Sequence, residues 1–107
     1  MALTRDFKQT VAASLRRDPA FAKALLNEAA TLFFNSEPGT ARLTLRELVN
    51  ATVGFEQLAT LTNTPSKNLH RMLSDRGNPR MDNLAAIFDA LRRQLKVDLR
   101  ARSVVAA

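Results

Sequence analysis

Four side chains that can hydrogen-bond lie at helical spacing in one short stretch of the chain. Positions 67 and 71 are one helical turn apart, as are positions 66 and 70, so in a helix all four share one face. These residues are Ser66, Lys67, His70 and Arg71. Side chains of these types suit the edges of nucleic-acid bases, and Arg or Lys on the O6 and N7 atoms of guanine is the commonest specific contact.

Basic residues gather around this stretch. The whole chain has a formal net charge of +6 at pH 7. Between positions 64 and 80 the charged residues are Lys67, Arg71, Arg76 and Arg80 against Asp75 alone. Such a patch is typical of proteins that bind polyanions, although many basic proteins never contact nucleic acid. Charge therefore supports a nucleic-acid partner without deciding it.

Other kinds of chemistry find little support in the residue types. The chain has no Cys, which excludes disulfides and thiolate zinc sites, and its only His excludes an imidazole metal cluster. No nucleophile, base and carboxylate fall at a spacing that suggests catalysis. We therefore predict that the protein is not an enzyme and uses no metal or cofactor.

Two short helices joined by a turn must position the polar face. Asn63 suits a left-handed turn residue, and Thr64 followed by Pro65 suits a helix start, by a side-chain cap and a fixed φ. Ala59 leaves room for the partner helix to approach closely. The apolar residues expected to be buried between the two helices are Leu58, Ala59, Leu61, Leu69, Met72 and Leu73.

The rest of the chain also shows helical periodicity. We expect a helix over residues 4–17 capped by Thr4, and a second from Asp18 and Pro19 to about Asn35. Turn formers and helix terminators at 35–39 predict a break. Further helices are expected at about 40–52, 55–61, 65–74 and 82–92, with a loop around 77–79. Residues 95–99 alternate apolar and polar, which fits a short strand, pairing with its copy in a dimer, or a frayed continuation of the last helix.

These elements predict an all-α fold of five to six helices. The chain of 107 residues suits one cooperative unit, with an N-terminal helical arm over 1–38 and a second region over 39–107. No apolar run approaches the roughly 20 residues of a membrane span. Arg5, Asp6 and Lys8 interrupt any apolar core of a signal peptide. We therefore expect a cytoplasmic protein with no membrane partner.

Several segments together resemble a known family. VNATVGFEQLA, TPSKNLHRML and GNPRMDNLAAIFDAL, and more weakly RRDPAFAKALLNEA, resemble the Cro/repressor-like (Xre-type) helix-turn-helix regulators. The likeness is greatest to addiction-module antidotes, the HigA-like antitoxins. It implies a lambda-repressor-like domain over 39–107 whose base-reading positions fall on Ser66, Lys67 and Arg71, with His70 beside them.

The resemblance also implies contacts to the DNA backbone. The family's phosphate-contacting position at the start of the first motif helix falls on Phe55, which departs from the usual polar residue and leaves Glu56 and Gln57 as substitutes. The expected phosphate contacts are Gln57, Asn68, Arg76, Asn78 and Arg80.

The function expected from these residues and this resemblance is sequence-specific DNA binding by a transcriptional regulator. A homodimer repressor on an inverted-repeat operator of double-stranded DNA is the form we predict, and the resemblance adds a toxin protein as a partner of an antitoxin. The alternative is a protein-interaction module that uses the helix-turn-helix as a scaffold. In that case the arm would bind its partner through the stripe of Phe21, Leu25 and Phe33.

Overall fold

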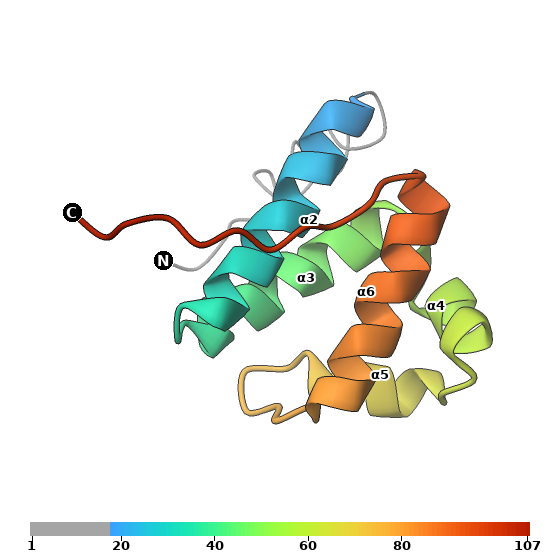
Figure 1. Ribbon diagram of the computed structural model, residues 1–107. Helices are drawn as coiled ribbons and strands as arrows, with labels where there is room; N and C mark the ends of the chain where they lie inside the picture. The colour runs from blue at the N-terminus through green and yellow to red at the C-terminus, as the bar shows by residue number, and fades with distance from the viewer. Residues whose placement is uncertain (1–17) are drawn as a thin grey trace, which may run out of the picture.

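The computed structural model describes residues 18–107, and this part of the chain contains five helices and no strand (Figure 1). The helices are α2 (Pro19–Phe34), α3 (Pro38–Ala51), α4 (Gly54–Thr62), α5 (Ser66–Met72) and α6 (Met81–Leu95). The all-α expectation is confirmed for these residues. The helix expected at 4–17, with its Thr4 cap, lies outside them.

The start of α2 agrees with the sequence, whereas the break after it is shorter than expected. The Asp18 carboxylate accepts a hydrogen bond of 3.0 Å from the Ala20 amide, and Pro19 occupies the first turn. After α2, only residues 35–37 interrupt the helices, because α3 already begins at Pro38. The prediction that Pro38 and Gly39 belong to the break was wrong: a proline needs no amide partner in the first turn of a helix.

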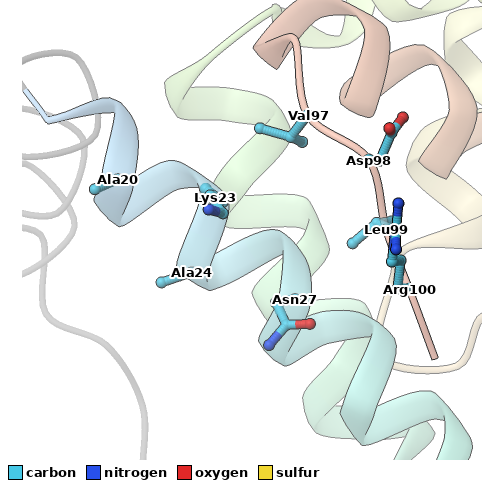
Figure 2. Close-up of a pocket in the computed structure, with 8 residues that line it drawn as sticks. All are labelled: Ala20, Lys23, Ala24, Asn27, Val97, Asp98, Leu99 and Arg100. Atoms are coloured by element: carbon cyan, nitrogen blue, oxygen red, sulfur yellow. The ribbon is translucent and has the colours of Figure 1, made fainter. Parts of the chain in front are cut away.

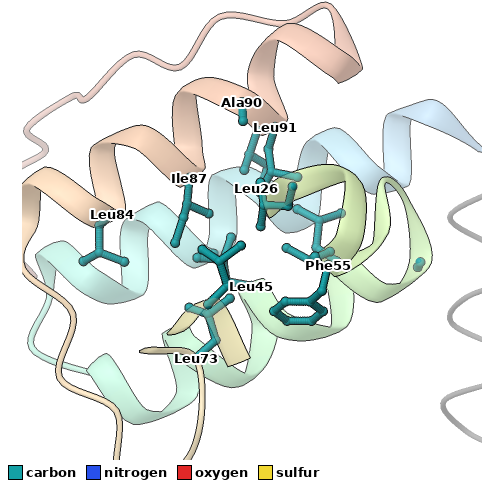
Figure 3. Close-up of a cluster of buried hydrophobic side chains, with 14 of the residues drawn as sticks. Leu26, Leu45, Phe55, Leu73, Leu84, Ile87, Ala90 and Leu91 are labelled. Carbon is teal, nitrogen blue, oxygen red and sulfur yellow. The ribbon is translucent and has the colours of Figure 1, made fainter. Parts of the chain in front are cut away.

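All five helices contribute to one aliphatic core (Figure 3). Helix α2 packs against α3 and α6, and α4 packs against α3, α5 and α6. The largest fully buried side chains are Leu26, Leu45, Leu48, Val49, Leu58, Leu69, Leu73, Ile87 and Leu91. Full burial of each such side chain contributes about 1.5 to 3 kcal/mol. Among the described residues no polar or charged side chain is buried, so this contribution is not offset by buried charge.

The chain after α6 forms neither a strand nor a longer helix. Lys96 adopts a left-handed conformation that ends α6, and the segment beyond it runs extended across α2 (Figure 1). Val97 and Leu99 pack against the core, while the residues between them are exposed, which explains the alternating pattern without a sheet. The predicted strand is therefore wrong for the described chain. No described helix has the length and hydropathy that crossing a membrane requires.

Candidate functional site

Helices α4 and α5 meet at a tight turn centred on Asn63. This residue has φ 50° and ψ 44°, the left-handed conformation that its type predicted. The Thr64 amide donates to the Ala59 carbonyl at 3.0 Å, which closes the end of α4. The expected cap of α5 is absent, because the Thr64 hydroxyl donates back to the Thr62 carbonyl and Pro65 itself occupies the cap position. The turn therefore has the expected shape with a different start to the second helix.

Apolar residues hold the two helices together and attach them to the core. Leu58, Leu69 and Leu73 are at most 1% exposed, and Ala59 and Met72 are partly buried. Leu61 departs from the prediction with 44% of its surface exposed. It lies in the last turn of α4, where no neighbouring helix covers it. The buried set still fixes which face of α5 points into the molecule.

The opposite face of α5 carries the polar residues that the sequence singled out. Lys67, His70 and Arg71 are exposed, whereas Ser66 is half-buried at the start of the helix. The Arg71 guanidinium donates to the Asn68 side-chain oxygen at 3.1 Å, which restricts its orientation. Three of the four expected base contacts thus lie on the solvent side of a helix whose inner face is anchored by Leu69.

His70 also makes a contact that the sequence did not reveal. Its ring stacks on Phe55 of α4 with the ring centroids 3.9 Å apart and the planes at 18°. Phe55 is only 6% exposed, so the imidazole covers a phenyl ring that belongs to the core. The one available signal was Phe55 itself, an aromatic residue at a position where the resembled family has a polar one.

Two arginines of α3 fasten the end of α5 and the loop that follows it. Arg42 donates to the carbonyls of Ser74 at 3.0 Å and Asp75 at 2.9 Å, and Arg46 reaches the Leu73 carbonyl at 3.5 Å. Sequence reasoning missed both residues, because their partners are backbone atoms about thirty positions away. Their contacts satisfy carbonyls that the short helix leaves without partners.

The loop after α5 presents the expected phosphate contacts to solvent. Arg76, Asn78 and Arg80 are exposed, as is Gln57 on α4, whereas Asn68 is partly buried beside Arg71. Gly77 shapes this loop, because a Cβ atom there would lie 2.7 Å from the Arg71 carbonyl oxygen and closer still to that of Met72. The backbone of the loop thus lies directly against the end of α5.

Comparison of the chain with models of known protein families, with curated proteins and with solved structures found no match. Function must therefore be argued from the geometry and charge of the chain itself.

Electrostatics distinguish this region from the far end of α6. Among the described residues, Lys67, Arg76 and Arg80 form no ion pair. On α6, Arg92 and Arg93 both pair with Asp89, at 2.7 and 3.0 Å. The hydrogen bond from Arg93, with the charges of both arginines, holds the pKa of Asp89 below its usual value against the opposing effect of desolvation. Positive charge is thus left uncompensated around α5.

The aromatic stripe of α2 lies largely against the molecule itself. Phe21, Leu25 and Phe33 are partly buried and pack on the core, and Phe33 meets Phe88 of α6 edge-on with centroids 6.0 Å apart. Phe34, at 66% exposed, remains the large apolar residue of α2 that faces solvent. The stripe that the interaction-module alternative required is therefore mostly used for packing.

Proposed function

We propose that this protein is a sequence-specific DNA-binding transcriptional regulator in which α4 and α5 form a helix-turn-helix and α5 is the recognition helix. The observation that carries the proposal is the division of α5 into two faces. Leu69 anchors one face in the core, and the other exposes Lys67, His70 and Arg71. A helix so anchored can enter a groove of DNA without any loss of core contacts.

The exposed residues suit two different kinds of contact. Lys67 and Arg71, one turn apart, are long donors suited to guanine edges, and the hydrogen bond from Arg71 to Asn68 orients its guanidinium before DNA arrives. Arg76 and Arg80 extend from the loop, where cations without ion pairs can neutralise phosphates and release counterions. The half-buried Ser66 has the shortest reach of the four predicted base contacts.

Double-stranded DNA suits this surface better than RNA. The major groove of B-form DNA is about 12 Å wide and admits an α-helix, and each base pair presents a distinct pattern of donors and acceptors there. The major groove of A-form RNA is too narrow for side chains to read. No described aromatic residue stands exposed as a platform on which single-stranded bases could stack near α5, where Phe55 is covered by His70.

A single α5 of seven residues contacts few base pairs, so specific binding needs a second copy. Proteins with this motif place two recognition helices about 34 Å apart, one turn of DNA. We therefore propose a homodimer that binds an inverted repeat and acts as a repressor by occupying it. The toxin partner implied by the family resemblance stays a prediction, because no described contact or cavity points to it.

Selection from a pool of random-sequence duplexes tests the proposal. We expect the full chain to enrich an inverted repeat whose half-sites are one helical turn apart, and sedimentation of the complex to give two chains per duplex. The double variant Lys67→Ala, Arg71→Ala should lose the enrichment, whereas the matched control Arg93→Ala, an exposed arginine on α6, should retain it. Enrichment of no sequence, or the same sequence with the double variant, would overturn the proposal.

A further inference from the structure

The stack between Phe55 and His70 has a geometry that favours a charged imidazole. Two neutral rings prefer an offset or edge-on arrangement to a face-to-face one. Here the planes are 18° apart and the centroids 3.9 Å, which is close to face-to-face. A cation above an aromatic face is attracted by the negative charge density of the ring. The pair is therefore arranged so that Phe55 stabilises the protonated form of His70.

The stack also fixes where the imidazole stands. His70 is exposed beside Arg71 on the outer face of α5, and Phe55 is the second residue of α4. In a helix-turn-helix the first helix crosses the DNA backbone while the second enters the groove. The ring is thus held at the junction of the two helices, next to where a phosphate would pass.

The charges around His70 are predominantly positive. The charged groups on the helices of this region are Glu56 of α4, Lys67 and Arg71 of α5, and Arg42, Arg46 and Glu47 of α3. The positive neighbours oppose protonation of His70 in the free protein, whereas a bound phosphate favours it. DNA and a proton should therefore assist each other in binding.

We propose that Phe55 holds His70 as a phosphate contact that is switched on by protonation, so that the affinity for DNA rises as the pH falls. This inference rests on the proposed function and adds a regulation of the same site. The protonated imidazole has two N–H donors, one of which can bind a phosphate oxygen while the ring face stays on Phe55. Phe55 acts as a positioning residue, and it takes the place of the polar residue that the resembled family uses.

The chain offers a clean test, because His70 is its only histidine. Histidine is the side chain whose charge ordinarily changes between about pH 5 and 8. Anisotropy titrations of the selected duplex should give about tenfold tighter binding at about pH 5.5 than at about pH 8, the size expected for one added charge-assisted contact. The log-log dependence on salt should also steepen at the lower pH by about 0.9, the value for one phosphate.

Two variants separate the parts of the proposal. His70→Gln keeps a hydrogen-bonding side chain without the titrating ring, and should bind equally at both pH values with the weaker affinity. Phe55→Leu keeps an apolar core residue but removes the aromatic face, and should reduce the pH dependence while binding at about pH 8 is retained. Thermal melts of both variants confirm that each is folded.

The outcomes distinguish this inference from the proposed function. Absence of DNA binding at both pH values overturns both proposals. Binding that is equal at both pH values in the parent chain, or a pH dependence that persists in His70→Gln, overturns only this one. Without DNA, the NMR signals of the single imidazole ring should show an upfield ring-current shift that disappears in Phe55→Leu, and its absence in the parent chain would also overturn the inference.

Discussion

Helices α5 and α6 both carry arginines on an exposed face, yet they use the charge differently. On α6 the guanidinium groups of Arg92 and Arg93 are paired with Asp89, and Arg92 also lies 3.5 Å from Asp98. On α5, Lys67 has no ion pair within the described chain and Arg71 bonds only to the neutral side chain of Asn68. The same residue type therefore stabilises a helix in one place and stays available to a ligand in the other.

The two helices also differ in what keeps them folded. With 15 residues, α6 spans four turns and has its own side-chain ion pairs, whereas α5 has seven residues and no side-chain cap. So short a helix is not stable alone in water. Its stability comes from Leu69 and Leu73 in the core, and from the Arg42 and Arg46 contacts to the backbone at its end.

The largest effect is expected for Leu69→Ala. The substitution removes a side chain that is 1% exposed at the contact between α4 and α5, and should cost about 2 to 5 kcal/mol of stability. DNA binding should be lost together with the fold of this region. Chemical denaturation and DNA titration of the variant measure both quantities. A stable variant that binds like the parent would contradict the dependence of α5 on this anchor.

Removal of either free cation of α5 should affect binding and not folding. Lys67→Ala and Arg71→Ala should each cost about 1 to 3 kcal/mol of binding free energy and relax base preference at one or two positions per half-site. Stability should change by no more than about 0.5 kcal/mol, as for most exposed substitutions. Arg93→Ala on α6 is the matched control and should leave binding unchanged. Equal losses in all three variants would erase the distinction between the helices.

The turn between α4 and α5 can be tested with a pair of substitutions at Asn63. Asn63→Ala places a Cβ-bearing residue that lacks the local hydrogen bonds of Asn in a left-handed conformation, and should destabilise the protein by about 1 kcal/mol. Asn63→Gly should be close to neutral, since glycine adopts this conformation without strain. Thermal melts of the two variants measure the difference, and a reversed order would contradict the turn geometry.

Arg80→Ala tests the loop cations in a different way. Arg80 is assigned to a phosphate, so its loss should weaken binding to all duplexes alike and lower the log-log slope against salt by about 0.9. Titrations at several salt concentrations on the selected and a scrambled duplex give both values. A change in base preference with an unaltered slope would place Arg80 on a base instead.

The smallest effect is expected on α6. Because Arg93 and Arg92 lower the pKa of Asp89 in the folded chain, its charge favours folding above the pKa of the unfolded chain. That contribution disappears as the pH falls through the lower, folded value. Asp89→Asn should therefore lower the melting temperature slightly near about pH 7 and leave it unchanged by about pH 2. A difference that persists in acid would mean that Asp89 acts other than by its charge.

Local patterns in the sequence predicted most of the helices and the turn between α4 and α5. Asp18 with Pro19 identified the start of α2, and Asn63 identified the left-handed turn, because these residue types act on their immediate neighbours in the chain. The pattern at 35–39 misled, since Pro38 is compatible both with a break and with the first turn of a helix. The pattern at 95–99 misled because packing on α2 produces the same alternation as a strand.

What the sequence alone determined is which residues are apolar, which are charged and where helices begin, all of which depend on spacing along the chain. The tertiary structure decided how those residues are used. Only packing brings Phe55 under His70, Arg42 to the loop after α5, and Val97 onto the core. Each of these contacts joins residues far apart in sequence, and no local propensity records a partner that the chain reaches only by folding.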